Sequence, residues 1–96
     1  EAAAVAAVFG ESRPAVTSIK GVTGHALGAA GALEAAAVVM SFQKRQIPPT
    51  ANTKVLGDGI DVDVVMGSAR DWEPGPTISN NFGFGGHNGS VVIAPA

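Results

Sequence analysis

Hydrophobic and polar positions divide the first half of the chain into two helical stretches and one short strand. Residues 1–9 (EAAAVAAVF) have high helix propensity, and Gly10 fits the position that follows a helix end. Residues 15–19 (AVTSI) alternate and are rich in β-branched side chains, which predicts a strand. A longer apolar stretch predicts a second helix over residues 24–43, with Thr23 as its N-cap.

The pattern after this helix, over residues 47–76, predicts loops with one short strand. Residues 47–50 (IPPT) contain two prolines, which end a helix and extend the chain. Residues 51–59 are rich in turn formers and predict a loop. Residues 60–66 (IDVDVVM) alternate apolar and acidic positions, which predicts a short edge strand, and residues 67–76 predict a polar connection.

The C-terminal pattern predicts a β-hairpin. Residues 77–81 and 90–94 are short strand-like runs on either side of a glycine-rich stretch, FGFGGHNG. A tight turn through these glycines would join the two strands. On pattern alone, Phe82 and Phe84 are expected to anchor the core.

Small side chains dominate one face of the predicted central helix. Close approach of another helix or a sheet is expected along that face, which consists of Gly24, Gly28, Gly31, Ala32, Ala35 and Ala36. The apolar run over residues 26–42 is mostly Ala and Gly and includes Glu34 and Ser41. It therefore favours a buried helix of a water-soluble domain over a membrane span.

Composition narrows the possible functions. The chain has 96 residues, which is at most one small domain, and no Cys. Without Cys, the chain itself cannot hold a disulfide, a Cys-ligated zinc, an iron–sulfur cluster or a thiol nucleophile. The net charge is −2, with scattered charges, so no nucleic-acid groove or polybasic membrane patch is indicated. A start at Glu1, inside a helix and without a signal peptide, suggests a cut through a longer polypeptide.

Lys20 and His25 are the first candidates for chemistry. The predicted strand would end near Lys20, and His25 would stand at the start of the following helix. The carboxyl end of a strand is where sites form in layered α/β folds. A neutral His at a helix N-terminus can donate a hydrogen bond to a developing oxyanion. A solvated Lys and a His that only caps packing are the alternative.

The glycine-rich turn and the acidic residues leave further alternatives open. Gly83, Gly85, Gly86 and Gly89 could offer backbone N–H groups to an anion, or simply form a tight turn. Glu34 is a lone acid within an Ala-rich helix and either contacts Lys20 or lies at the surface. The other carboxylates are expected to face water and lack calcium-loop spacing; they are Asp58, Asp61 and Asp63.

Two stretches resemble the β-ketoacyl-acyl-carrier-protein synthases, the ketosynthases of the thiolase-like superfamily. Residues 18–52 (SIKGVTGHALGAAGALEAAAVVMSFQKRQIPPTAN) and 79–93 (SNNFGFGGHNGSVVI) carry the likeness, in the family's order and separation. The likeness is greatest to the elongating bacterial type in its actinobacterial form, with polyketide ketosynthases as the near alternative. It implies an α/β fold in which residues 1–96 are part of the C-terminal thiolase-like half, a mixed sheet layered with helices and incomplete on its own.

The resemblance also implies a reaction and roles for residues. The family carries out decarboxylative Claisen condensation of malonyl carrier protein with an acyl thioester. By position, His25 would stabilise the enolate, Lys20 would support the site electrostatically, and Glu34 would be the buried acid that contacts this Lys. Phe84 would be the gating aromatic, with its N–H in the oxyanion hole, and Gly83, Gly85 and Gly86 would form the mobile hinge. No catalytic proton is assigned to His87.

The same resemblance implies the partners. Acyl carrier protein would deliver substrates on its phosphopantetheine arm, with no bound cofactor or metal, and the intact enzyme would be a cytoplasmic homodimer. The family's nucleophilic Cys and a further catalytic His have no counterpart in this chain, so the isolated chain is expected to be inactive. A non-catalytic partner resembling a chain-length factor, or a structural fragment, is the alternative function.

Overall fold

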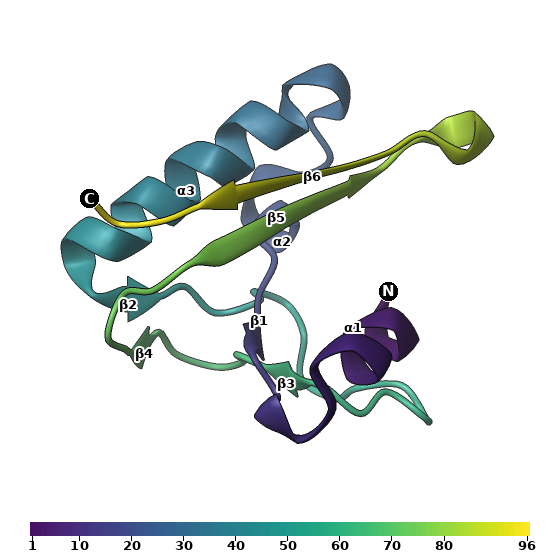
Figure 1. Ribbon diagram of the computed structural model, residues 1–96, viewed down its shortest axis with the longest axis horizontal. Coiled ribbons are helices and arrows are strands. Elements are labelled where there is room, and N and C mark those ends of the chain that lie inside the picture. The colour runs from purple at the N-terminus through teal and green to yellow at the C-terminus, as the bar shows by residue number, and fades with distance from the viewer.

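A computed structural model describes residues 1–96 as a mixed α/β arrangement (Figure 1). Its helices are α1 (Ala2–Phe9), α2 (Lys20–Thr23) and α3 (Ala30–Lys44), with 3₁₀ turns η1 (Gly10–Ser12), η2 (Leu27–Ala29) and η3 (Phe84–Gly86). Its strands are β1 (Ala15–Val16), β2 (Gln46–Ile47), β3 (Asp63–Val64), β4 (Arg70–Asp71), β5 (Thr77–Phe82) and β6 (Asn88–Ile93).

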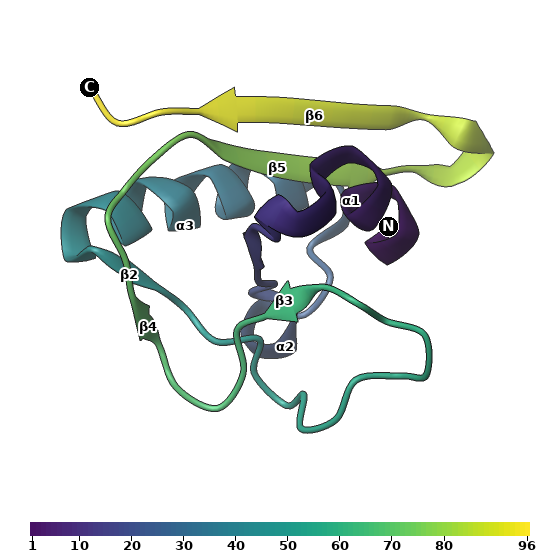
Figure 2. The same cartoon turned by 60° about the horizontal axis from the view of Figure 1, so that its bottom comes forward.

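The strands form three separate pairs. β5 and β6 are antiparallel over six residue pairs, from Thr77 opposite Ile93 to Phe82 opposite Asn88. β1 pairs with β3 in parallel, and β2 pairs with β4 antiparallel. Helix α3 runs alongside the β5–β6 hairpin in both views, whereas α1, α2 and the short strands β1 and β3 lie to one side of this layer (Figures 1 and 2).

A very small buried core holds the loops together. Ala30, Ile47 and Val65 are the buried residues, and Val65 keeps only 1% of its surface exposed. The Val65 N–H donates to Val16 O at 2.9 Å, and Val65 O accepts the Thr50 N–H at 2.7 Å. Val65 therefore fixes the segment after α3 to strand β1 as well as filling the core.

The end of α3 packs against the segment around β4. The rings of Phe42 and Trp72 have centroids 6.0 Å apart, and the Trp72 backbone N–H donates to Arg45 O at 3.1 Å. Arg45 adopts the left-handed conformation (φ 53°, ψ 37°) that ends the helix. The polar connection predicted over 67–76 thus contains strand β4, which short-range patterning could not show because its partner β2 lies more than twenty residues away.

Much apolar surface stays uncovered. The accessible surface is 6624 Å², whereas a folded chain of this mass would expose about 5,000 Å². Val22, Val55, Leu27 and Val92 are among the large apolar side chains that lie mostly in solvent. No helix combines the length and apolar character that crossing a bilayer requires, and the longest, α3, has 15 residues.

The predicted N-terminal helix and the hairpin are confirmed. α1 ends at Phe9, and the Gly10 N–H closes it by donating to Ala6 O, with φ of 53° at Gly10. The hairpin turn runs through Gly85 and Gly86, whose φ angles are 77° and 81°. Glycine adopts this left-handed region without the penalty of a Cβ.

The strand predicted over 15–19 and the helix predicted over 24–43 are wrong at their junction. The strand stops at Val16, and Thr23 is the last residue of α2 instead of an N-cap. Positive φ angles at Gly24 (70°) and Leu27 (51°) interrupt the helical path, so α3 begins only at Ala30. The strand predicted over 60–66 is likewise reduced to β3, the part that pairs with β1.

Two packing predictions are also corrected. Phe82 is more than half exposed and Phe84 is fully exposed, because both lie at the hairpin end, where nothing covers them, so neither anchors the core. The small-residue face permits close approach at Gly31, where a Cβ would lie 3.6 Å from Asn81 Nδ2. At Gly24 and Gly28 nothing lies within 4 Å of such a Cβ.

We expect Gly21→Ala to destabilise the complete gene product by about 1–3 kcal/mol, the usual cost of overpacking. A Cβ at Gly21 would lie 2.2 Å from Ala51 O, and backbone cannot move aside as a flexible side chain can. Urea unfolding would measure the loss. Gly28→Ala is the matched control, since its Cβ meets open space; an equal loss in both variants would contradict the close approach at Gly21.

Candidate functional site

The carboxylate of Glu34 joins three elements. Glu34 lies in the first half of α3, with 17% of its side chain exposed, and its Oε1 forms an ion pair with Lys20 Nζ from α2. Its Oε2 accepts hydrogen bonds from Asn81 Nδ2 at 2.9 Å and Ser79 Oγ at 3.3 Å, both from β5. The sequence left open whether Glu34 contacts Lys20 or lies at the surface, and the structure shows the contact.

Local geometry explains why these side chains meet. Residues two apart on a strand share a face, so Ser79 and Asn81 both point toward α3. Gly31 precedes Glu34 by about one helical turn and leaves room for the Asn81 amide. These two donors are functional candidates that sequence reasoning missed. The available signal was the spacing of Ser79 and Asn81, which are two residues apart on one strand face, together with the small Gly31 on a helix. This signal does not show which helix the strand packs against.

Electrostatics favour the ionised form of Glu34. Burial acts to raise the pKa of this carboxyl, but hydrogen bonds from Lys20, Asn81 and Ser79, together with the Lys20 charge, lower the pKa below its usual range. Glu34 is therefore a stable anion, suited to holding a cation in place instead of exchanging a proton near neutral pH.

Lys20 is positioned by backbone contacts around α2. The Lys20 N–H donates to Ser18 Oγ at 3.3 Å, and Lys20 O accepts the Gly24 N–H at 3.0 Å. Asn52 Nδ2 donates to Gly21 O at 2.8 Å, which ties α2 to the loop after β2. Lys20 is thus the first residue of a single helical turn, and not the end of a strand as predicted.

His25 lies on the exposed link between α2 and η2, not at the start of α3. Its Nδ1 accepts the backbone N–H of Leu27 at 3.1 Å. An accepting Nδ1 assigns the ring proton of a neutral imidazole to Nε2. The positive φ of Leu27 accompanies this contact. The exposed imidazole is thereby oriented with an N–H donor free for a ligand.

The glycine-rich turn stands apart from these residues. Phe84 is fully exposed at the tip of the hairpin, which projects beyond α3 (Figure 1). The Gly83 N–H donates to His87 O and closes the base of the turn. The structure therefore brings Lys20 and Glu34 together. His25 and Phe84 are exposed, and neither of them bonds to Lys20 or Glu34.

A shallow depression lies beside the ion pair. Lys20, Glu34, Thr23 and Leu33 are among its lining residues, and its empty volume is about 160 Å³. Small-molecule pockets usually measure about 300–1,000 Å³. This depression is therefore too small to hold an acyl chain.

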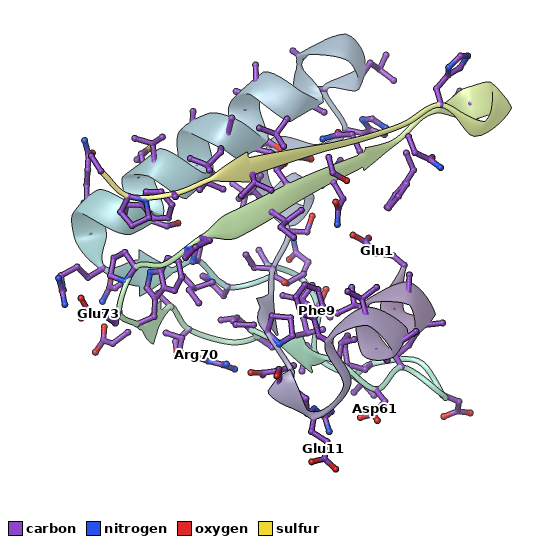
Figure 3. All side chains as sticks on the ribbon, viewed as in Figure 1. Glu1, Phe9, Glu11, Asp61, Arg70 and Glu73 are labelled. Atoms are coloured by element: carbon purple, nitrogen blue, oxygen red, sulfur yellow. The ribbon has the colours of Figure 1, made fainter.

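Three further acidic residues form surface ion pairs: Asp61, Asp63 and Glu73. Asp63 accepts two hydrogen bonds from Arg70, at 2.6 and 2.9 Å, and Asp61 pairs with Arg13. The Arg70 hydrogen bonds lower the pKa of Asp63 against the effect of burial, and the Arg70 and Arg13 charges add to the lowering. Asp61 and Arg70 lie on the side of the molecule away from the hairpin (Figure 3). No group of three acidic or His side chains is placed to hold a metal ion.

Comparison with known proteins identifies the class. Residues 1–54 match the family described as "Beta-ketoacyl synthase, C-terminal domain", which is more than half of the chain. The chain belongs to this family, and the resemblance noted in the sequence is confirmed.

Individual relatives carry a common name, 3-oxoacyl-[acyl-carrier-protein] synthase 2. The chain is 43% identical to that of Coxiella burnetii over 96 residues, covering 98% of the chain and 23% of the relative. It is 45% identical to that of Vibrio harveyi over 84 residues (88% and 20%). It is 42% identical to that of Mycobacterium tuberculosis over 93 residues (97% and 22%). The chain thus spans about a fifth of the length of these relatives.

Replacing the central carboxylate should give a pH-dependent loss of stability. Because the folded-state pKa of Glu34 is lowered, its ionised form stabilises folding above the usual glutamate pKa of about 4.3, and this contribution is lost as pH falls through the lower folded-state pKa. We expect Glu34→Gln to cost about 1–2 kcal/mol at pH 7, limited by the partial exposure of Lys20.

Unfolding of the complete gene product by urea at pH 7 and at successively lower pH would test this dependence. The difference between wild type and Glu34→Gln should shrink on acidification. Glu73→Gln, which removes an exposed partner of Arg45, should show little difference at any pH. A Glu34→Gln deficit that stays constant down to acid pH would contradict the proposed ionised contact.

Proposed function

We propose that the complete protein is a 3-oxoacyl-[acyl-carrier-protein] synthase that extends acyl chains in fatty-acid synthesis. One observation carries the proposal: His25, in the segment that matches the family, presents an Nε2–H donor because its Nδ1 is occupied by the Leu27 N–H. An exposed, oriented donor of this kind is what an enolate oxygen requires. The names of the relatives support the same reaction class.

The proposed reaction assigns a role to each group. The bond between the malonyl carboxylate and the α-carbon breaks, carbon dioxide leaves, and the electron pair forms an enolate whose oxygen accepts from His25 Nε2–H. The enolate carbon then attacks an acyl thioester and expels its thiolate. Lys20, held by Glu34, adds positive potential to the site. The attacked thioester must be held outside residues 1–96, since these contain no Cys.

The hairpin supplies the remaining part of the proposal. Phe84 would act as a gate, its N–H would join the oxyanion hole, and Gly83 and Gly85 would let the turn move. Full exposure of Phe84 and positive φ at Gly85 support a turn that swings without disturbing a packed core. In this proposal residues 1–96 form part of a thiolase-like half, and the uncovered apolar surface contacts the remainder of a homodimeric enzyme.

The proposed partner is acyl carrier protein, which would deliver both substrates on phosphopantetheine, with no cofactor or metal bound by the enzyme itself. Purified complete gene product, incubated with malonyl and acyl carrier protein, should form the 3-oxoacyl product and carbon dioxide. Absence of both products, together with tight association with an active ketosynthase, would favour a non-catalytic partner instead.

His25→Ala in the complete protein should lower malonyl decarboxylation by about 10²–10³-fold, the usual effect of losing an oxyanion donor. Transfer of the acyl group onto the enzyme should stay largely intact, because that step precedes enolate formation. Carbon dioxide release and acyl-enzyme formation are measured separately. His87→Ala is the control, and loss of acyl transfer with normal decarboxylation in His25→Ala would contradict the assignment.

A further inference from the structure

The amide of Asn81 has a specific contact with the Glu34 carboxylate. Its Nδ2 lies 2.9 Å from Glu34 Oε2, closer than Ser79 Oγ at 3.3 Å, and it rests against Gly31. A neutral donor stabilises a carboxylate without cancelling its charge. The full charge of Glu34 thus remains available to Lys20 at the other oxygen.

Asn81 also lies where β5 meets the glycine-rich turn. It is paired with Gly89 on β6, and the strand ends one residue later at Phe82. Its side chain is therefore a link between the ion pair and the strand end from which the Phe84 turn projects. The neighbouring Asn80 points to the opposite face, where its Oδ1 accepts from Ser90 Oγ at 2.6 Å.

We propose that Asn81 is a positioning residue, which orients the Glu34 carboxylate so that Lys20 stays at the site while the adjacent turn moves. This inference rests on the proposed function for its catalytic consequence. Its structural part, the control of Glu34 by Asn81, stands independently of that function. Without the Asn81 donor, Oε2 keeps only the longer Ser79 contact, and the carboxylate can turn away from Lys20.

Few charged groups can interfere with this arrangement. Among the elements packed against α3, η2, β2, β5 and β6 carry no charged residue, and the charged strand β4 lies beside the far end of the helix, next to Phe42. Lys20, from α2, is the charged group that faces Glu34, and the other charged residue of α3, Lys44, lies at the far end of the helix. A negative charge placed at position 81 would therefore act on Glu34 with little competition.

Asn81→Asp is the sharpest variant, because it preserves shape but replaces the donor by a like charge. In the complete protein we expect kcat for malonyl decarboxylation at pH 7 to fall about tenfold. The acid limb of the pH profile should move to higher pH, because a neighbouring anion raises the pKa of Glu34 and Lys20 then loses its partner at higher pH. Asn80→Asp, with the same charge on the other face, should behave like wild type.

A double variant separates action through Glu34 from a general structural effect. In a Glu34→Gln background, Asn81→Asp should produce no further shift of the pH profile. A profile of Asn81→Asp equal to that of Asn80→Asp, or a shift that persists without Glu34, would overturn the proposal.

Titration of the Glu34 carboxyl by NMR tests the proposal without any activity. The pKa of Glu34 should rise in Asn81→Asp and, more modestly, in Asn81→Ala, which removes the donor without adding charge and serves if the Asp variant does not fold. An inactive wild type with these shifts would reject the proposed function alone. An active wild type with an unchanged Glu34 titration would reject the role of Asn81 alone.

Discussion

The arrangement of the helices and the hairpin depends on the hydrogen bonds and the ion pair of one largely buried carboxylate, that of Glu34. Glu34 brings a charge into the contact between α3 and β5, and such a charge is costly unless it is paired and hydrogen-bonded. Lys20 provides the charge, and Ser79 and Asn81 provide the remaining bonds. Because these partners come from α2 and β5, satisfying one carboxylate fixes the relative positions of three elements that share very little buried apolar surface.

This polar link carries particular weight because the apolar core is small. Only Ala30, Ile47 and Val65 are buried, and the strand pairs β1–β3 and β2–β4 contain two residue pairs each. Backbone contacts therefore do much of the positioning, as at Gly21, where no side chain would fit against Ala51. A site built in this way holds its charged groups firmly at the centre and leaves its periphery, including Phe84, without packing partners among residues 1–96.

Local patterns predicted the elements whose determinants are local. Helix propensity and Gly10 located α1, and alternation on either side of a glycine-rich stretch located the β5–β6 hairpin. The interruption after Thr23 was not predictable, because it arises from positive φ at Gly24 and at Leu27, a residue that seldom adopts it. Strand β4 and the Asn81 contact were missed for another reason: both depend on which distant segments become neighbours. Sequence pattern and motif resemblance named Lys20, His25 and Glu34 as candidates, but geometry was needed to show that only Lys20 and Glu34 touch.

The separation of His25 and Phe84 from the ion pair has a physical rationale within the proposed chemistry. A group that meets substrate must keep a bonding direction free, whereas a group that sets the local potential must be held still. Glu34 has both oxygens occupied and serves the second purpose. Nδ1 of His25 accepts a hydrogen bond from Leu27, whereas Nε2 has no partner. One such bond is enough to orient the imidazole while its donor stays available. The hairpin turn is closed at its base by Gly83 and His87 and is unpacked at its tip, as the proposed aromatic gate would require. The bonded groups thus lie together around Glu34, the groups with a free bonding direction lie outside them, and Asn81 lies at the boundary between the two.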